Sequence, residues 1–362
     1  MRLPRHAELW LPAYLRDRLR RSMSPSIGPM QVWLAIADHF EPFVGNPDES
    51  RASERVEIWG RDWPSIAKRY CDSAGKHPKY TFFYPQEQYR PDLIDALSNI
   101  TRQGVGDVEI HIHHDGEGEQ DFVERMSTFR DTLYHRHGLL REHQGKIRFG
   151  FIHGNWALDN SLPNGKWCGL NNEITLLEDL GCYADFTMPS VNSPTQARTI
   201  NEIYWAVDDP AQPKSYDRGR PFEAGERSKN LLMVPGPLGI RWAERFLPRL
   251  ESGEIASYDL PSQYRVKRWL SCAPRIGQNI FIKLFGHGAQ ERNLSALLGG
   301  GLDRLFKSAQ AECRHRGWRL NYVSCWEMYQ AIDSIRQRVN PVMAHKTPHR
   351  ADQPNSSVVS IQ

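Results

Sequence analysis

Paired cysteines are what this sequence most plainly lacks. Its six cysteines are scattered over the chain, and no two of them stand in a CxxC pair. Zinc ribbons and small disulfide-stapled domains both depend on closely spaced cysteines, so the sequence argues against both classes. We therefore expect free, buried thiols.

An excess of one charge is missing as well. The chain carries 46 lysines and arginines against 43 aspartates and glutamates, a net charge of +3, and the two kinds are interleaved. Such a balance creates no strong field that would attract nucleic acid or an anionic membrane. Nucleic acid is therefore not an expected partner.

Long apolar runs and the marks of an export signal are not found either. Residues 1–25 are basic and amphipathic, without the apolar stretch or the small-residue cleavage site of a signal peptide. We predict a helix there that docks on the body of the protein, with contact to a membrane surface as the alternative. The expected location is cytoplasmic, either free or peripheral to the inner membrane face, and the polar residues 341–362 are predicted to be a disordered tail.

The middle of the chain, residues 26–340, is predicted to be a distorted (β/α) barrel of about seven to eight parallel strands. Short runs rich in β-branched and aromatic residues alternate with segments of helical period, a pattern typical of a parallel sheet wrapped by helices. No repeat period is present, which excludes a solenoid. A chain of 362 residues is long enough for an α/β barrel as a single domain.

The predicted elements follow from these patterns. The strands are expected at 31–37, 80–84, 108–113, 147–152, 183–188, 230–234, 280–285 and 319–323. The helices are expected at 53–73, 91–102, 120–142, 172–180, 195–206, 240–251, 260–272, 293–316 and 326–338. Residues 208–227, rich in proline and charge, are predicted to form a long surface loop near the active face.

Histidines gather at the end of the third predicted strand, where residues 111–115 read His-Ile-His-His-Asp. Side chains on a strand alternate faces, so His111 and His113 share one side with Asp115, while His114 points to the other. Two imidazoles at this spacing can bind one cation. The plainer interpretation is a polar strand end with hydrogen-bonded histidines.

Three other predicted strands end in similar residues. The first is followed by Asp38 and His39, the fourth by His153, and the seventh by a Gly-His-Gly segment that contains His287. In a barrel, the carboxyl ends of the strands converge on one face. The sequence therefore predicts one site that draws histidines from four strands.

These motifs, in this order, resemble the polysaccharide deacetylase superfamily (NodB-homology, carbohydrate esterase family 4). The resemblance spans residues 31–330 and rests on Asp38-His39 after an apolar strand, the His-x-His pair, and the late strand 281–284 that leads to His287. It implies a distorted (β/α) barrel that uses a divalent metal, usually zinc, to hydrolyse the N-acetyl group of a sugar.

The resemblance also implies the catalytic roles. Asp38 matches the family's base, and His287 matches its general acid. His39 stands where the family has a second aspartate as a metal ligand, and imidazole is itself a good zinc ligand. A metal would thus be held by His39, His111 and His113, with a position left for water.

Some assignments stay open at this point. His114 or Asp115 could replace His113 as a ligand, and Asp38 could bind the metal directly. The family's arginine motif has no match in the segment 153–156.

That segment supplies the predicted substrate contacts. Trp156 could stack on a sugar, Asn155 could hydrogen-bond it, and His153 could contact it or cap the strand. The expected function is deacetylation of an N-acetylated sugar in a glycan or glycan precursor. The alternatives are an inactive carbohydrate-binding barrel and a hydrolase of another amide or glycosidic bond.

Overall fold

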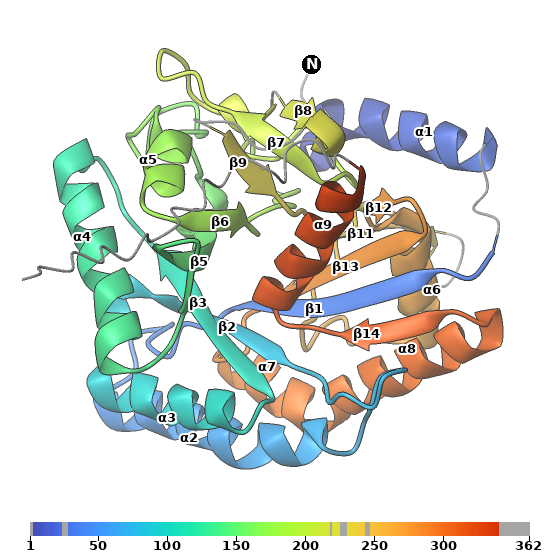
Figure 1. Cartoon of the computed structure of the whole chain (residues 1–362), viewed down its shortest axis with the longest axis horizontal. Helices are drawn as coiled ribbons and strands as arrows, with labels where there is room; N and C mark the ends of the chain where they lie inside the picture. Colours follow the sequence, from blue (N-terminus) through green and yellow to red (C-terminus); the bar gives the residue numbers. More distant parts are fainter. Residues whose placement is uncertain (1–2, 24–27, 218, 225–229, 243–246, 340–362) are drawn as a thin grey trace, which may run out of the picture.

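A mostly parallel sheet of twelve strands forms the centre of the molecule (Figure 1). The computed structural model describes residues 3–23, 28–217, 219–224, 230–242 and 247–339. The predicted tail at 341–362 and part of the predicted loop at 208–227 lie outside these residues. The strands of the sheet are β1 (Gln31–His39), β2 (Tyr80–Pro85), β3 (Gly106–Ile112), β4 (Arg141–His143), β5 (Lys146–His153), β6 (Cys182–Asp185), β7 (Tyr204–Val207), β8 (Gly219–Pro221), β9 (Asn230–Met233), β12 (Arg275–Ile276), β13 (Asn279–Gly286) and β14 (Arg319–Tyr322).

The pairing order is β12-β13-β1-β2-β3-β5-β6-β9-β7-β8, with β14 also on β1 and β4 on β5. Eight of these strands pair in parallel, namely β13, β14, β1, β2, β3, β5, β6 and β9. They are the eight strands that the sequence predicted. Antiparallel strands extend the sheet at both ends, so within the described residues the pairings form an open series and not a closed ring.

Helices cover both faces of the sheet (Figure 1). They are α1 (Ala7–Met23), α2 (Glu49–Ala67), α3 (Pro91–Arg102), α4 (Glu119–Asp131), α5 (Glu173–Asp179), α6 (Gln263–Cys272), α7 (Glu291–Ala296), α8 (Leu302–Arg316) and α9 (Cys325–Val339). On one face, alternate residues of β1 such as Ile36 pack with Trp59 of α2 in the larger apolar core. On the other face, Ala35 and Ala37 pack with Ile332 of α9 in a second core. Neighbouring residues at the end of β1 therefore lead to different sides of the sheet.

Two predicted helices are wrong. The segment 195–206 is largely irregular and ends in β7, whose aromatic and β-branched residues pair with β9. The segment 240–251 contributes to a hairpin of β10 (Gly239–Trp242) and β11 (Pro248–Glu251). There Arg241 lies 3.1 Å from the buried carboxylate of Glu251, so a cross-strand ion pair outweighs helix propensity.

Two predicted helices are too long. The helix predicted at 53–73 ends at Ala67. The helix predicted at 120–142 ends earlier, and Gly138, with φ of 64°, precedes β4.

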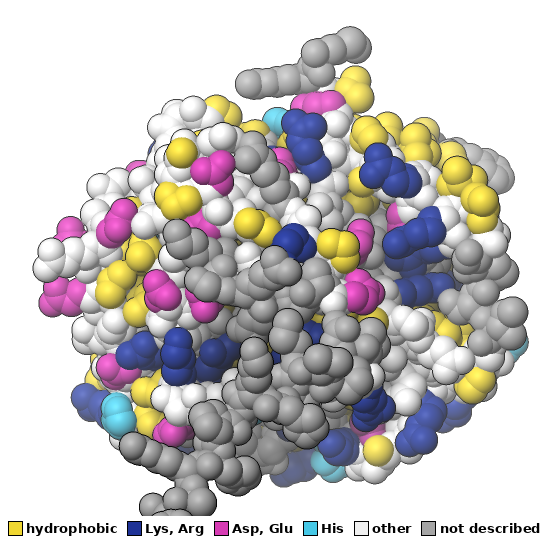
Figure 2. Space-filling view, turned by 45° about the horizontal axis from the view of Figure 1, so that its top comes forward, with side chains coloured by type: hydrophobic (Ala, Val, Ile, Leu, Met, Phe, Trp, Pro, Cys, Tyr) yellow, Lys and Arg dark blue, Asp and Glu magenta, His cyan; other side chains and the backbone are white. Residues whose placement is uncertain are grey.

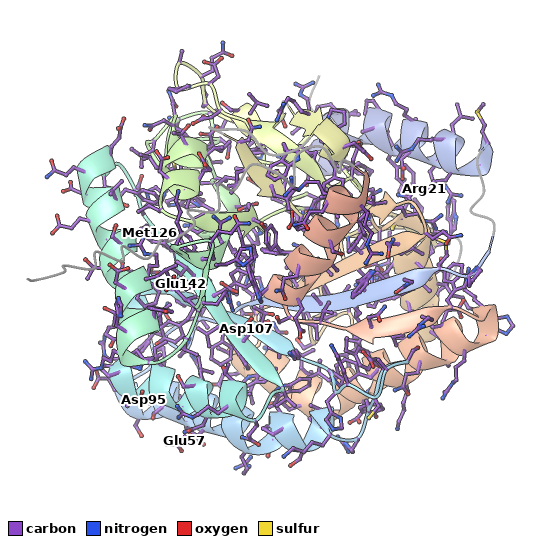
Figure 3. The ribbon with its side chains drawn as sticks, viewed as in Figure 1. Arg21, Glu57, Asp95, Asp107, Met126 and Glu142 are labelled. Atoms are coloured by element: carbon purple, nitrogen blue, oxygen red, sulfur yellow. The ribbon has the colours of Figure 1, made fainter. Side chains whose placement is uncertain are left out.

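The N-terminal helix α1 docks on the body of the protein. Its Trp10 and Tyr14 are buried beside Val191 and Leu238. Arg21, directed from α1 toward the rest of the fold in Figure 3, donates to the carbonyl oxygens of residues 272 and 273 at 3.2 and 3.1 Å. The predicted docking is therefore present.

The predicted membrane contact stays a prediction. No helix in the described part of the chain is long and apolar enough to cross a membrane. On the face shown in Figure 2, acidic and basic side chains are interspersed, in keeping with the small net charge.

All six cysteines are free, as predicted. Five are buried, whereas Cys71 is exposed, so the expectation of burial is wrong for that residue.

Candidate functional site

Three strands bring histidines together at their carboxyl ends. The ring of His39, from β1, lies 5.1 Å from that of His111, from β3, and 4.9 Å from that of His287, which follows β13. His39 and His111 are buried. The convergence that the sequence predicted is present for these three residues.

A carboxylate completes the histidine group. Donor atoms of His39, Glu41 and His111 all lie within 4.8 Å of one another, and Glu41 Oε1 is 3.2 Å from His111 Nε2. His111 Nδ1 donates to the carbonyl of Ile152 at 2.8 Å, which orients the ring so that Nε2 faces Glu41. His39 Nε2 is buried without a hydrogen-bond partner among the described residues. An orphaned imidazole nitrogen beside a carboxylate fits a divalent metal.

The protonation states suit metal binding. Burial lowers the pKa of His39 well below its usual value, and the neighbouring His287 and His111 lower it further. For Glu41, burial acts against ionisation, but the hydrogen bond and charge of His111 outweigh it, so its pKa is lowered. The group thus presents a neutral imidazole at His39 and an ionised carboxylate at Glu41.

His113, which the sequence placed among the ligands, borders this group. Its Nδ1 lies 2.5 Å from Glu87 Oε1, and its Nε2 lies 3.6 Å from Glu41 Oε1. The other residues proposed in its place point elsewhere, since Asp115 accepts a hydrogen bond from the backbone of Trp167 at 2.7 Å. His114 projects to the opposite face of β3, as strand alternation predicted.

Asp38, predicted as the base, lies on the other face of β1 from His39. Its two carboxylate oxygens accept hydrogen bonds from the backbone N–H of Gly288 at 2.9 and 2.8 Å. Burial raises the pKa of Asp38 to about 7, against the effect of that hydrogen bond. The carboxylate therefore tethers the segment that carries His287.

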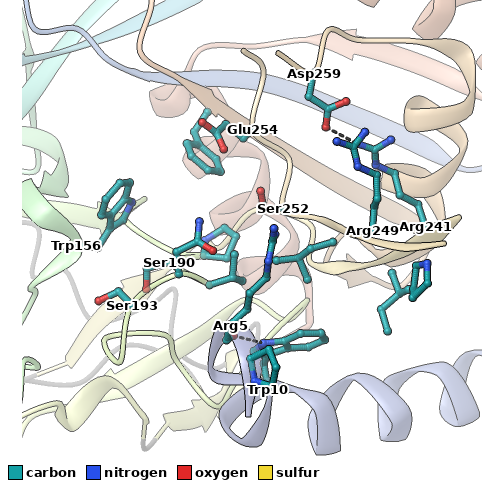
Figure 4. A pocket seen from close by; sticks show the side chains of 18 of the residues that line it. Arg5, Trp10, Trp156, Ser190, Ser193, Arg241, Arg249, Ser252, Glu254 and Asp259 are labelled. Carbon is teal, nitrogen blue, oxygen red and sulfur yellow. Dashed lines mark hydrogen bonds and ion pairs between the residues drawn. The ribbon is translucent and has the colours of Figure 1, made fainter. Parts of the chain in front are cut away.

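A cavity of about 660 Å³ lies near the histidine group, from which it is separated by the side chains of its wall (Figure 4). Trp156 and Phe285 belong to its wall, and their rings lie 5.9 and 6.2 Å from that of His39. Figure 4 shows Glu254 near this end and Arg5 reaching in from the residues just before α1. The volume is within the range of small-molecule sites.

The predicted substrate contacts separate in the structure. Trp156 lies on the cavity wall, and Asn155, next to it, has a left-handed backbone with φ of 54°. His153 is fully buried and belongs to a second group, with His114, Cys168 and Glu173. This buried group could also hold a metal ion.

Comparison with known proteins assigns no family. No protein-family model matches the chain, and a search of curated proteins found no match. What the chain does is therefore inferred from the site itself.

Sequence reasoning missed three residues of these groups. Glu41 stands only two positions after His39, and that spacing was the available signal. Cys168 and Glu173 lie far from the histidines in sequence, in and after a loop without a recognisable motif. Only the folded chain brings them to His114 and His153.

Proposed function

We propose that this protein is a metal-dependent hydrolase that removes the acetyl group from an N-acetylated sugar. The observation that carries the proposal is the convergence of His39, Glu41 and His111 beside a cavity walled by Trp156 and Phe285. The distorted barrel and the family resemblance are parts of the same proposal. The eight parallel strands and the order of the motifs support them.

The residues at this position suit zinc. Two imidazoles and one carboxylate are a common catalytic zinc set, with a further position open to water. A divalent metal there would lower the pKa of a bound water toward about 7 and polarise an amide carbonyl. In this arrangement His39 and His111 offer nitrogen and Glu41 offers a negatively charged oxygen, while His113 stands next to them.

His287 is placed to move a proton. Burial lowers its pKa, so the imidazole is neutral at neutral pH, and the nearby carboxylates of Glu41 and Glu254 act in the opposite direction. A neutral imidazole accepts a proton from the attacking water and returns it to the departing amine. The position of its ring, 4.9 Å from that of His39, supports this role.

The cavity supports a carbohydrate as the substrate. Trp156 presents an aromatic ring at the end of the cavity nearest the histidines, and aromatic rings stack on the apolar faces of sugars. Serine, arginine and carboxylate side chains line the remainder, as hydroxyl-rich ligands require (Figure 4). An N-acetyl group held at Trp156 would face the metal-binding residues.

Acetate release tests the function. The purified chain, loaded with zinc, is incubated with N-acetylated sugar oligomers, and acetate is measured enzymatically. His111→Ala should lower the rate at least about 100-fold because it removes one of three ligands. His135→Ala, which removes an exposed imidazole outside the site, should leave the rate unchanged. Release of free sugar without acetate, or equal rates in the two variants, would contradict the proposal.

A further inference from the structure

A second group of metal-ligating side chains lies on the other side of β3 from the first. His114 follows β3, His153 ends β5, Cys168 lies in the loop before α5, and Glu173 is the first residue of α5. All four are buried, and one donor atom of each lies within 4.8 Å of the others. The sequence placed His153 and His114 at the deacetylase site, but in the structure they belong to this second group and do not line the cavity.

The two histidines direct their free nitrogens at each other. His153 Nδ1 donates to the carbonyl of Gly154 at 2.5 Å, and His114 Nδ1 lies 3.0 Å from Glu117 Oε1. The contact of His114 Nδ1 with Glu117 lacks hydrogen-bond geometry, whereas the two Nε2 atoms are 2.9 Å apart. Something positive must lie between them, either a proton or a metal ion.

The carboxylate of Glu173 and the sulfur of Cys168 both accept hydrogen bonds from backbone N–H groups. Glu173 Oε1 lies 3.1 Å from His114 Nε2 and 3.4 Å from His153 Nε2, whereas Oε2 is held by the backbone N–H of residue 159 at 2.6 Å. The Sγ of Cys168 accepts from the backbone N–H groups of residues 160 and 170 at 3.2 and 3.5 Å. Cys168 Sγ also donates to Glu173 Oε2 at 3.4 Å, and a metal ion bound here would take the place of that thiol proton.

The separations resemble those of a tetrahedral zinc site. Zinc bonds of about 2.0–2.1 Å to nitrogen and oxygen place two such ligand atoms about 3.3 Å apart. The observed separations among the two Nε2 atoms and Glu173 Oε1 are 2.9, 3.1 and 3.4 Å. Four protein ligands in a buried place leave no position for substrate, which is typical of structural sites.

We propose that His114, His153, Cys168 and Glu173 bind a structural zinc ion. The ion ties the loop 157–172 and the start of α5 to the ends of β3 and β5. Because His114 lies three residues beyond His111, this second site also fixes the strand end that carries the first. The proposal does not depend on the deacetylase activity.

Cobalt spectroscopy on the full chain tests this site. Zinc is exchanged for cobalt(II), and the expected result is a thiolate-to-cobalt charge-transfer band in the near ultraviolet, because only the second site contains a cysteine. The band should persist in a His39→Ala, His111→Ala double variant and disappear in Cys168→Ser. Cys182→Ser, which changes a buried thiol outside the group, should keep it.

Metal analysis supplies the stoichiometry. We expect about two zinc ions per wild-type chain and about one in the double variant. Wild-type protein that binds cobalt without the charge-transfer band would overturn the proposal, even if Cys168→Ser fails to fold. So would a double variant that retains no metal, since a proton would then occupy the second group. Absence of acetate release would count against the first site alone.

Discussion

At the scale of single residues, neighbours in the sequence perform different tasks. His39 faces His111 and His287, whereas Asp38 faces the core beneath α2 and accepts hydrogen bonds from Gly288. The resemblance assigns Asp38 the role of base, and that role stays a prediction. The observed contacts favour a positioning role, in which Asp38 acts through the segment that carries His287.

Asp38→Asn separates these roles. The amide keeps one acceptor but turns its NH₂ group toward the Gly288 N–H, so the His287 segment should shift while the metal is retained. We expect kcat for acetate release to fall about tenfold, with an unchanged shape of the pH–rate profile. If kcat falls more than about 100-fold and the pH–rate profile no longer declines at acidic pH, Asp38 is identified as the base. His287→Ala, which also retains the metal, gives the reference for complete loss of the proton-transfer group.

At the scale of elements, burial distinguishes two faces of α1. Trp10 is 4% exposed, packs beside Val191 and Leu238 and lines the cavity, whereas Leu15 is 59% exposed. Both are apolar residues of one amphipathic helix, and the sequence predicted the helix without distinguishing their surroundings. The docked face links α1 to the cavity through Trp10.

Replacing Trp10 tests this docking. Trp10→Ala should lower the free energy of unfolding by about 3 kcal/mol, because it removes a large buried ring and leaves a cavity. The matched change Leu15→Ala on the exposed face should cost less than about 0.5 kcal/mol. Urea denaturation followed by circular dichroism measures both values. Equal effects of the two changes would show that α1 is not held by its Trp10 face.

At the scale of the whole molecule, burial makes stability depend on pH. Asp185, on β6, is buried and accepts from the hydroxyl and the backbone N–H of Thr187 at 2.6 and 3.0 Å. Burial raises its pKa to about 7 in the folded state, although Thr187 and Lys283 oppose this. The folded protein therefore holds a proton that the unfolded chain, with an ordinary aspartate pKa near 3.8, releases.

A buried acid whose pKa is higher in the folded protein than in the unfolded chain makes the protein less stable as the pH rises. The loss occurs between the pKa of the unfolded chain and the pKa of the folded protein. Asp185→Asn mimics the protonated acid and removes this dependence. Relative to wild type, the variant should gain about 2 kcal/mol of unfolding free energy between pH 5 and pH 7. Urea denaturation at the two pH values provides the comparison, and a constant difference between the proteins would contradict the raised pKa.

Features that depend on interactions between residues close in sequence could be predicted, whereas features that depend on contacts between distant segments could not. The eight parallel strands were predicted because hydrophobic periodicity is local, and the meeting of His39, His111 and His287 followed from the shared direction of their strands. The helix predicted at 195–206 is wrong because β7 pairs with β9, and the helix predicted at 240–251 is wrong because the two ends of that segment pair with each other. Glu41 was missed because it stands beyond the end of β1, where strand alternation no longer indicates direction.

The sequence by itself determined the α/β class, the parallel strands and which strand ends carry imidazoles, since these depend on patterns within a few residues. Only the tertiary structure decided which side chains share a site. It paired Glu41 with His111, turned Asp38 to Gly288, and placed His153, a predicted substrate contact, in a buried group with Cys168. The physical reason is that ligand geometry depends on contacts between segments that are distant in sequence and are fixed only when the core packs.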